Sequence, residues 1–470
     1  MQTVRLHDTL SGELRAVEPR TPGRVGIYAC GPTVYDRVHV GNARPFVLFA
    51  LLKRFFKHVG HEVTLVENIT DVNDKIYAAA RAAGRPSDEL AREMAERYVE
   101  DTSRLALGRP DAEPRATDSI PGIIDLIQAL IDRGHAYAAA GDVYFRVRSH
   151  AGYGKLSNRA LGDMVQGEDD DLARGGLKES PLDFALWKAS KPGEDTSWAA
   201  PWGTGRPGWH IECSAMAEEI LGLDFEIHGG GSDLVFPHHE NEVAQTEAAR
   251  GAPLARLWMH NGMIRFEDEK MSKSVGNIRS LHGALDEYGR DALVMYLVSG
   301  HYRQPLGFSA EALAEAARSV ERVRELARRL DPDAPARPGG DPHVERFFAA
   351  LAEDFNTAAA RAALFEWVGD ANRRTDAGEA VGTHELRAML WGLGLEGLAQ
   401  TSGEAKDEDP VAVRLLEERE AARAARDFAT ADARRDELAA LGWAVRDTPE
   451  GPSLVPTRGG EPPAPSSPAG

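Results

Sequence analysis

The segment FPHHENE, at positions 236–242, holds two histidines and two glutamates within seven residues. A helix would place His238 and Glu242, four residues apart, on one face, where both side chains can reach a single metal ion. His239 and Glu242, three residues apart, form a second candidate pair. Metallopeptidases also take two ligands from one helix, so the segment predicts a metal site without choosing its chemistry.

The only two cysteines among the 470 residues are Cys30 and Cys213. They form no CxxC pair and no disulfide framework, so they are either separate core thiols or members of one shared site. Cys30 ends a predicted strand, and a parallel sheet presents its ligand site at the carboxyl ends of its strands. Together with His238 and Glu242, the two cysteines make four ligands of a set that suits Zn²⁺.

The elements that must position these residues begin with RVGIYAC, residues 24–30, which predicts a short buried strand. A glycine-bearing turn and an apolar helix at 46–60 follow, and HEVTLVENIT, residues 61–70, predicts a second strand. This order predicts the opening unit of an α/β nucleotide-binding fold with a parallel sheet. Strand character returns at 223–231 and at 257–266, so the sheet resumes later in the chain.

The rest of the chain divides by composition. Between residues 76 and 205 charged helices and an acidic, glycine-rich loop predict an insertion, and beyond residue 306 the sequence is almost wholly helical. The arginines of segment 316–330 are equally compatible with a salt-bridged, solvated helix face and with a stripe that faces phosphates. The Pro-, Gly- and Ser-rich ending predicts a disordered tail.

Bulk properties narrow the class of protein. With 42% hydrophobic and 27% charged residues, the chain has the composition of a globular enzyme of several domains. No apolar run approaches the ~20 residues of a membrane span, and the polar N-terminus lacks a secretory signal, so we expect a cytoplasmic location. The net charge of −19 argues against a general electrostatic grip on nucleic acid but is compatible with a local basic patch.

Two further motifs have residue types suited to phosphate chemistry. HVGN, residues 39–42, lies where the first predicted strand meets the first helix, so His39 and the helix N-terminal amides face any anion bound there. KMSKS, residues 270–274, places Lys270 and Lys273 with two hydroxyls on a loop. Such lysines can balance charge on a phosphate as pyrophosphate leaves, although either motif alone is also compatible with ordinary surface.

Taken together, HVGN and KMSKS resemble the two ATP-binding motifs of class I aminoacyl-tRNA synthetases. The resemblance implies that ATP, with Mg²⁺, is bound by His39, Gly41, Asn42, Lys270, Ser272 and Lys273, of which His39, Asn42, Lys270 and Lys273 are catalytic. The first motif of that family usually ends in His, whereas this chain has Asn42. Asn retains a hydrogen-bond donor but cannot become cationic.

The stretches YACGPTVYD, NITDVNDKI, GWHIECSAM and HGGGSDLVFPHHENE resemble the cysteinyl-tRNA synthetase family, and the resemblance runs from about residue 5 to 450. It implies activation of L-cysteine by ATP, with release of diphosphate, and transfer to the 3′ end of tRNA(Cys) with release of AMP. It also implies one Zn²⁺ per chain, held by Cys30, Cys213, His238 and Glu242. The residues expected around the substrate cysteine are Thr70, Trp209 and Asp233.

The same resemblance predicts an α/β fold: a Rossmann-type parallel-sheet catalytic domain with an inserted domain, followed by an all-α helical-bundle region on the anticodon side. We expect the chain to act as a monomer. The predicted domains are the first half of the Rossmann domain at 1–120, an inserted connective domain at 121–205, the second half with the KMSKS loop at 206–305, a helical tRNA-binding bundle at 306–400, a small C-terminal anticodon-side domain at 410–450 and a disordered tail at 451–470.

Two other enzyme classes compete with this interpretation. A cysteine ligase of mycothiol biosynthesis would activate cysteine in the same way and pass it to an amino-sugar. A zinc peptidase would need a second His at the spacing of an HExxH helix, which HHENE does not supply. The C-terminal stretch VRLLEEREAARAARDFATADARRDELAALGWAVRDTPEG favours the synthetase, because it resembles the anticodon-side helices of that family.

Overall fold

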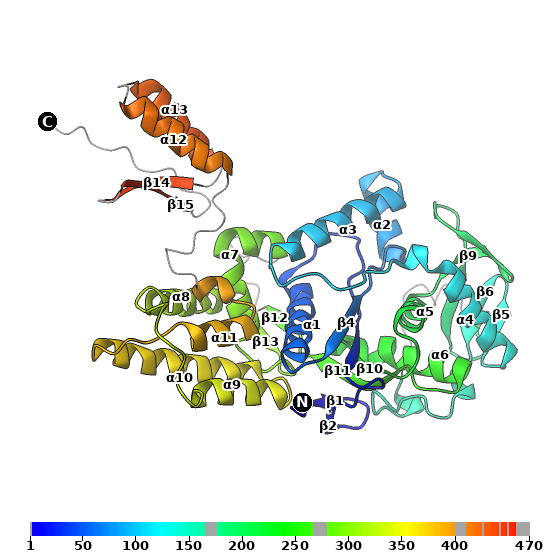
Figure 1. The fold of residues 1–470 in the computed structure, drawn as a ribbon. Helices are drawn as coiled ribbons and strands as arrows, with labels where there is room; N and C mark the ends of the chain where they lie inside the picture. The colour runs from blue at the N-terminus through cyan, green and yellow to red at the C-terminus, as the bar shows by residue number, and fades with distance from the viewer. Residues whose placement is uncertain are drawn as a thin grey trace. The chain divides into compact units, whose positions relative to one another are not determined.

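The computed structural model describes residues 2–164, 176–266, 280–399, 410–424, 427–440, 443–448 and 451–456. The chain forms two compact units, Met1–Ala399 and Gln400–Gly470. The larger unit contains the parallel sheet and the helices that follow it (Figure 1). Among the described helices, none combines the length and the apolar character needed to cross a membrane.

A four-stranded parallel sheet lies at the centre of the larger unit, with strand order β11-β10-β3-β4. Strand β4 follows β3 in the chain and pairs with one edge of it. Strand β10, which comes much later in the chain, pairs with the other edge of β3. The carboxyl ends of β3 and β10 therefore meet at a topological switch point, where sheets of this kind bind ligands. The strands are β3 Arg24–Ala29, β4 Glu62–Glu67, β10 Phe225–Gly231 and β11 Ala255–Asn261.

Helix α1, Val40–His58, connects β3 to β4 and packs its apolar face on the sheet (Figure 1). Phe46, Phe49, Phe55 and Phe56 are all buried, so the phenylalanines that predict the helix also form its core contact. The helix begins six residues before the predicted 46–60, because His39 caps it, and it continues through Pro45.

The prediction of an α/β nucleotide-binding fold is thus confirmed, with one difference in the strands. The stretch 257–266, which predicts a single strand, forms two strands in separate sheets. Its first part belongs to β11, while β12, Ile264–Phe266, pairs in parallel with β13, Leu306–Phe308. The bend between them comes at Gly262, where a Cβ atom would lie 2.4 Å from backbone atoms of Gln304.

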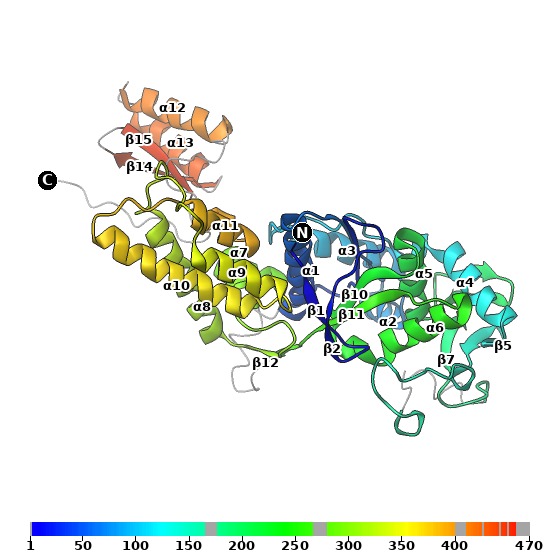
Figure 2. The same ribbon diagram turned by 60° about the horizontal axis from the view of Figure 1, so that its bottom comes forward.

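Between β4 and β10 the chain builds several helices and a second, antiparallel sheet in the order β5-β6-β7-β9-β8. This sheet and α4 bury an apolar cluster of their own around Trp187 and Phe145. Figure 2 shows α4 and β5 at the far end of the molecule from α8 and α10. The bounds are α2 Asp74–Ala83, α3 Ser87–Ser103, α4 Ile120–Asp132, β5 Ala136–Ala139, β6 Asp142–Phe145, β7 Phe184–Ala189, β8 Trp198–Ala200 and β9 Gly203–Pro207.

The remaining elements of the larger unit are a small N-terminal hairpin and helices. Helix α7 contains a non-helical residue at Gly289, and α8 packs against it. In segment 316–330, Arg324 pairs with Asp291 and Glu321, so at least this arginine belongs to a salt-bridged face. The bounds are β1 Arg5–Asp8, β2 Glu13–Ala16, α5 Trp209–Leu221, α6 Glu240–Arg250, α7 Leu281–Leu297, α8 Ala310–Ala327, α9 Pro342–Ala352, α10 Thr357–Asp376 and α11 His384–Gly392.

The smaller unit contains two helices and a hairpin. Helices α12, Pro410–Ala424, and α13, Phe428–Ala440, pack together around Leu415 and Leu438. Strand β14, Trp443–Thr448, pairs antiparallel with β15, Gly451–Pro456. The prediction of disorder from residue 451 onward is therefore wrong for residues 451–456. Backbone pairing with β14 orders this segment, although its composition predicts no ordered structure.

Candidate active site

The carboxyl ends of β3 and β10 bring the first metal-ligand candidates together. Cys30 follows β3 directly, and its backbone N–H donates to the carbonyl of Gly229 on β10 at 3.0 Å. A side chain at Gly229 would not fit, because its Cβ would lie 2.3 Å from the ring of Phe49. The glycines of HGGG therefore allow helix α1 and the candidate site to approach the strand closely.

FPHHENE forms a π-helical turn, Val235–His239, that runs directly into α6. The predicted pairing of His238 with Glu242 is present, with Nε2 of His238 3.2 Å from Oε1 of Glu242. His239 also faces the site, and its Nε2 lies 3.8 Å from the same oxygen. The turn is kinked at Phe236, whose backbone is extended (φ −142°, ψ 132°). The second candidate pair, His239 with Glu242, is therefore also present.

Cys30, Cys213, His238 and Glu242 lie together, each offering one ligand atom within 4.8 Å of the others. An overlapping group that satisfies the same limit contains Cys30, His228, His239 and Glu242. All these side chains are buried. Their described hydrogen-bond partners include no lysine or arginine. Two thiols, an imidazole and a carboxylate form a donor set that fits a borderline-soft divalent metal ion.

Histidines outside the predicted set surround these ligands. Nδ1 of His238 lies 2.9 Å from Nδ1 of His210, and Nδ1 of His239 lies 2.7 Å from Nε2 of His260. His228 places Nε2 2.9 Å from Oε2 of Glu242. A metal-ligating histidine commonly uses its second nitrogen in such a bond, which fixes the orientation and tautomer of the ring.

Burial favours the uncharged forms of three histidines and of the Cys30 thiol in this region. It lowers the pKa of His238, His210 and His260 to about 3 in each case. Burial also raises the pKa of the Cys30 thiol, and the neighbouring Cys213 and Glu242 add to that rise. Neutral imidazoles keep a lone pair for a metal ion, and a bound cation would favour loss of the thiol protons.

A cavity of about 290 Å³ opens beside the cluster, lined by Cys30, His39, Gly41, Asn42, Trp209 and Asp233 among others. His39 caps α1: its Nδ1 accepts a hydrogen bond from the backbone N–H of Gly41 at 3.0 Å. A Cβ at Gly41 would lie 2.6 Å from the His39 ring, so glycine is needed there. Burial lowers the pKa of His39 against the opposing effect of Asp233.

The hydrogen bonds of the helix cap determine which atoms of His39 and Asn42 remain as hydrogen-bond donors for a ligand. Since Nδ1 of His39 accepts, the neutral ring carries its proton on Nε2, which makes Nε2 a donor. Asn42 accepts from the backbone N–H of His39 through Oδ1 at 3.2 Å, which orients its amide NH₂ as a second donor. Asn42 thus completes a capping box with His39.

Of the residues expected around the substrate, Trp209 begins α5 and stacks on His238, with ring centroids 4.3 Å apart. Asp233 is exposed and lines the same cavity. Thr70 is buried beside the cavity rather than in its wall, where its Oγ accepts from Nδ2 of Asn68 at 3.2 Å. Lys270, Ser272 and Lys273 lie outside the described residues.

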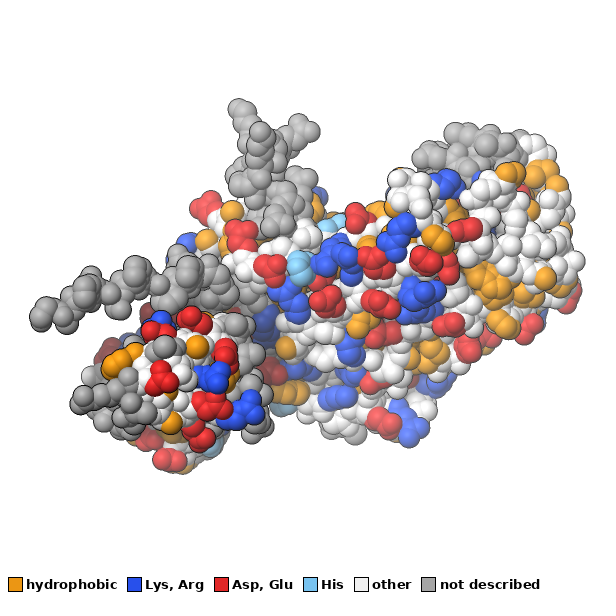
Figure 3. Space-filling model, turned by 90° about the horizontal axis from the view of Figure 1, so that it is seen from above, with side chains coloured by type: hydrophobic (Ala, Val, Ile, Leu, Met, Phe, Trp, Pro, Cys, Tyr) orange, Lys and Arg blue, Asp and Glu red, His pale blue; other side chains and the backbone are white. Residues whose placement is uncertain are grey.

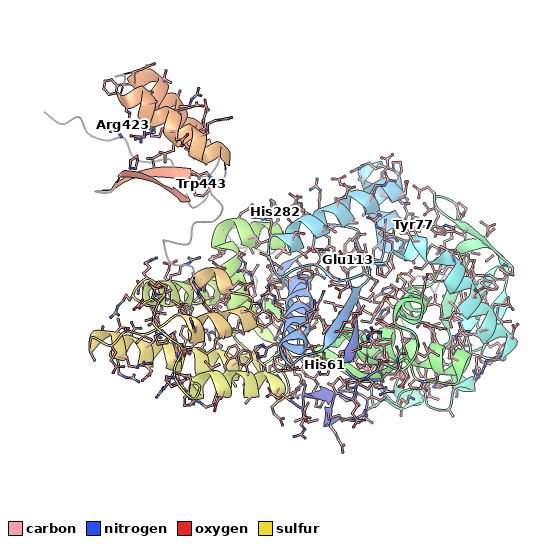
Figure 4. The ribbon with its side chains drawn as sticks, viewed as in Figure 1. His61, Tyr77, Glu113, His282, Arg423 and Trp443 are labelled. Atoms are coloured by element: carbon pink, nitrogen blue, oxygen red, sulfur yellow. The ribbon has the colours of Figure 1, made fainter. Side chains whose placement is uncertain are left out.

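A second, larger cavity of about 740 Å³ adjoins the first and shares Thr33, Lys75 and Trp209 with it. It lies between α2 and the antiparallel sheet, where Tyr77 (labelled in Figure 4) bonds to Thr196. Among its lining residues, Lys75, Arg81, Lys188, Lys191 and Arg206 are basic and only Asp74 and Glu194 are acidic. In a chain of net charge −19, this excess makes the lining of the larger cavity locally basic.

Family models match nearly the whole chain. Residues 16–318 match the catalytic domain of class I (C) tRNA synthetases, residues 346–395 a DALR domain, and residues 406–451 a cysteinyl-tRNA ligase anticodon-binding domain. The cysteine–tRNA ligase of Chromohalobacter salexigens is 45% identical over 96% of this chain and 99% of its own length, and that of Methylobacillus flagellatus is 46% identical over 96% and 99%. The chain belongs to the cysteine–tRNA ligase family.

The fold of this cysteine–tRNA ligase family member is also seen in solved structures. Methionyl-tRNA synthetase of Mycobacterium tuberculosis, in complex with methionyl-adenylate, superposes with a TM-score of 0.59 at 17% identity. The superposition covers 80% of this chain and 88% of that one. At this identity it supports the class I synthetase fold, and the predicted fold class and family are confirmed.

The anticodon-binding match decides between the two cysteine ligases considered from the sequence, because it covers the region expected to contact tRNA. Residues that sequence reasoning missed include His228, Glu67 and Asn261. His228 lies on β10, while Glu67 and Asn261 end β4 and β11 and line the smaller cavity. The places of Glu67 and Asn261 at the carboxyl ends of parallel strands could have identified these two residues.

Proposed function

We propose that this chain is a cysteine–tRNA ligase that joins L-cysteine to tRNA(Cys) at the expense of ATP. The cysteine carboxylate attacks the α-phosphorus of ATP, and the bond to diphosphate breaks. A hydroxyl of the terminal tRNA ribose then takes the cysteinyl group, and AMP leaves. The observation that carries the proposal is the buried cluster of Cys30, Cys213, His238 and Glu242. It lies beside a cavity that His39 lines, in a chain of this family.

For the metal, we favour Zn²⁺, one per chain, held by Cys30, Cys213, His238 and Glu242. Two thiolates and an imidazole suit zinc better than Mg²⁺ or Ca²⁺. The alternative group that contains His228 and His239 is less favourable, because it offers one thiol where the first group offers two. When bound, zinc supplies a Lewis acid that prefers the thiolate of cysteine to the hydroxyl of serine.

This preference matters because size alone separates cysteine from serine poorly. A pocket that distinguishes two substrates only by the size of one small group separates their binding free energies by only about 1–3 kcal/mol. We propose that Trp209 and Thr70 bound the substrate and that the Asp233 carboxylate accepts from its ammonium group. Asp233 and Trp209 both line the cavity that begins at Cys30, which supports this assignment.

For ATP, we propose that Nε2 of His39, the amide of Asn42 and the backbone at Gly41 bind phosphate at the N-terminus of α1. Lys270, Ser272 and Lys273 complete the site from the following loop, and Mg²⁺ accompanies ATP. The capped geometry of His39 and Asn42 supports the first part of this assignment. The lysines act mainly on the transition state, where charge develops on the departing diphosphate.

For tRNA, we propose that the larger, basic cavity receives the single-stranded 3′ end. Its junction with the smaller cavity at Thr33, Lys75 and Trp209 supports this path, because the terminal ribose must reach the adenylate. Asp74 pairs with the buried Lys188 and Arg206, and Lys75, Arg81 and Lys191 add further positive charge for phosphates.

We assign the segments in keeping with these roles. Residues 1–120 and 206–305 form the catalytic domain, 121–205 the connective insertion, 306–400 a helical tRNA-binding bundle and 410–450 an anticodon-side domain. We propose that the chain acts as a monomer. The reaction belongs to protein synthesis, which favours the cytoplasm.

The test measures which amino acid drives exchange of labelled diphosphate into ATP, and which acceptor then takes the product. We expect exchange with cysteine, a far lower rate with serine, and transfer to tRNA(Cys). Transfer to glucosaminyl-inositol in place of tRNA would favour the amino-sugar ligase. Absence of exchange with cysteine would refute both.

A further inference from the structure

The start of helix α7 is joined to the wall of the smaller cavity through the backbone. Leu281, its first residue, donates its N–H to the carbonyl of Val38 at 2.9 Å, and Ser280 forms a β-bridge with His39. The ring of Phe266 packs edge-on against His39, with centroids 6.3 Å apart. Phe266 and Ser280 flank residues 267–279, which contain KMSKS, so both described flanks of that segment contact His39.

A side-chain connection accompanies this backbone contact. Asp101 of α3 has a fully buried carboxylate, whose Oδ1 lies 2.9 Å from Nδ1 of His282 on α7. Its Oδ2 lies 3.4 Å from Nη1 of Arg37, which lines the smaller cavity. One carboxylate from a third element therefore contacts the residues next to the backbone junction on both sides, Arg37 before Val38 and His282 after Leu281.

Figure 4 labels His282 at the start of α7, beside the end of α3. A further contact ties α7 to the segment that follows α3, since Arg290 of α7 donates to the carbonyl of Leu105 at 3.0 Å and at 2.8 Å. Around them, Arg104 pairs with the exposed Asp286 at 2.5 Å. The exposed pair contributes little, whereas a buried carboxylate persists only when its partners satisfy it.

The position of Asp101 separates it from the metal cluster. Its described partners are Arg37 and His282, which belong to the HVGN side of the site. The metal-ligand candidates instead come from the ends of β3 and β10, from α5 and from α6. A change at Asp101 should therefore alter the ATP half of the site and spare the cysteine half.

We infer that Asp101 is a positioning residue for the activation of cysteine by ATP. By holding Arg37 and His282 together, it fixes the start of α7, and with it one flank of the segment that contains Lys270 and Lys273, against His39. Asp101 does not touch the substrates in this assignment. The inference rests on the proposed function, because it concerns the same site and the same first step.

The test is the substitution Asp101→Asn in the full chain, which keeps the size of the side chain and removes its charge. Misplacement of a reacting group costs up to about 100-fold in rate, so we expect kcat for exchange to fall by about 10- to 100-fold and KM for ATP to rise. KM for cysteine and bound zinc should stay unchanged. Asp286→Asn is the matched control, because it removes an exposed carboxylate that contacts His282 but not Arg37.

His282→Ala supplies a second route if Asp101→Asn does not fold. It should reproduce the kinetic change, and the double variant should cost no more than the larger single effect. Equal changes in KM for ATP and cysteine, or a lowered melting temperature with wild-type kinetics, would overturn the positioning role. Wild-type protein that fails to exchange diphosphate with cysteine would instead refute the proposed function itself.

Discussion

His228 lies 2.9 Å from Glu242, with Nε2 facing Oε2, and both side chains are fully buried. The other oxygen of Glu242 faces His238 and Cys30, at 3.2 Å and 3.6 Å. One carboxylate thus joins the metal-ligand candidates to a histidine behind them. Such an outer partner orients the carboxylate, and its loss commonly lowers metal affinity by about 10- to 100-fold.

The substitution His228→Phe should weaken metal binding. Phe keeps the stacking of His228 on Trp258, whose ring centroids are 4.4 Å apart, but it cannot hydrogen-bond to Glu242. We expect zinc affinity to fall by about 10- to 100-fold, measured by competition with a chelator. His228→Gln, which can still donate, should retain more affinity, and equal losses in both variants would argue that packing alone is responsible.

The substitution Cys213→Ser should remove a direct ligand candidate. Because a ligand matters more than its outer partner, we expect zinc content to be lost and exchange with cysteine to fall by more than about 100-fold. Elemental analysis and diphosphate exchange measure the two effects. Met216→Leu, a volume-conserving change in the same helix, is the control. Normal exchange by metal-free protein would contradict the role of the metal.

The substitution Lys273→Ala tests the loop. Loss of one group that stabilises transition-state charge costs about 10²- to 10³-fold in kcat, with a much smaller change in the affinity for cysteine. Steady-state exchange kinetics separate the two quantities. Arg265→Ala, at an exposed position on β12, should leave both unchanged. A pure loss of affinity would show that Lys273 binds the ground state.

The substitution Lys191→Glu tests the basic cavity. Reversal of one charge that faces phosphates should raise KM for tRNA and make charging more sensitive to salt, while exchange without tRNA stays at the wild-type rate. Arg92→Glu is the matched control, because Arg92 lies exposed on α3, outside the lining of that cavity. Figure 3 shows basic and acidic side chains mixed over the face that it presents, so a general surface effect should be weak.

Glu67 predicts a dependence of stability on pH. Burial raises its pKa from 4.5 to about 7, although a hydrogen bond from Tyr98 opposes this rise. The folded state therefore favours protonated Glu67, and this contribution is fully present below pH 4.5 and lost as pH rises through about 7. The difference corresponds to about 3 kcal/mol.

The measurement is denaturant unfolding of the wild type and of Glu67→Gln, which imitates the protonated acid, at several pH values. The variant should lose part of the decrease in stability between pH 5 and pH 8, and should gain relative to the wild type at the higher value. Parallel curves for the two proteins would contradict the assignment of this titration to Glu67.

Much of this arrangement could be predicted from the sequence, because it follows from the order of elements along the chain. The runs at 24–30 and 61–70 identify neighbouring parallel strands, and Cys30 follows the first of them directly. Spacing alone could not place His239, because the turn Val235–His239 is kinked at Phe236, and the fold brings Nε2 of His239 to 3.2 Å from Sγ of Cys30. His228 was missed because it belongs to a strand, where it resembles an ordinary buried residue.

The same limit applies to the capping of α1. From the sequence, Asn42 is a departure from a family motif. In the structure its Oδ1 accepts from the backbone of His39, a role that a short amide side chain fills well at the third residue of a helix. Contacts between elements distant in the chain, such as Asp101 with Arg37 and His282, follow only from the fold.

The strand order β11-β10-β3-β4 also has a consequence for biosynthesis. Cys30 comes before the insertion, whereas Cys213, His238 and Glu242 all follow it, and Cys30 and Glu242 are separated by 212 positions. At about 5–20 residues per second, a ribosome needs roughly 10–40 s to deliver Glu242 after Cys30. Throughout that interval Cys30 is a thiol without its partners, so a metal ion that needs all four proposed ligands could bind only once both halves of the sheet have been made.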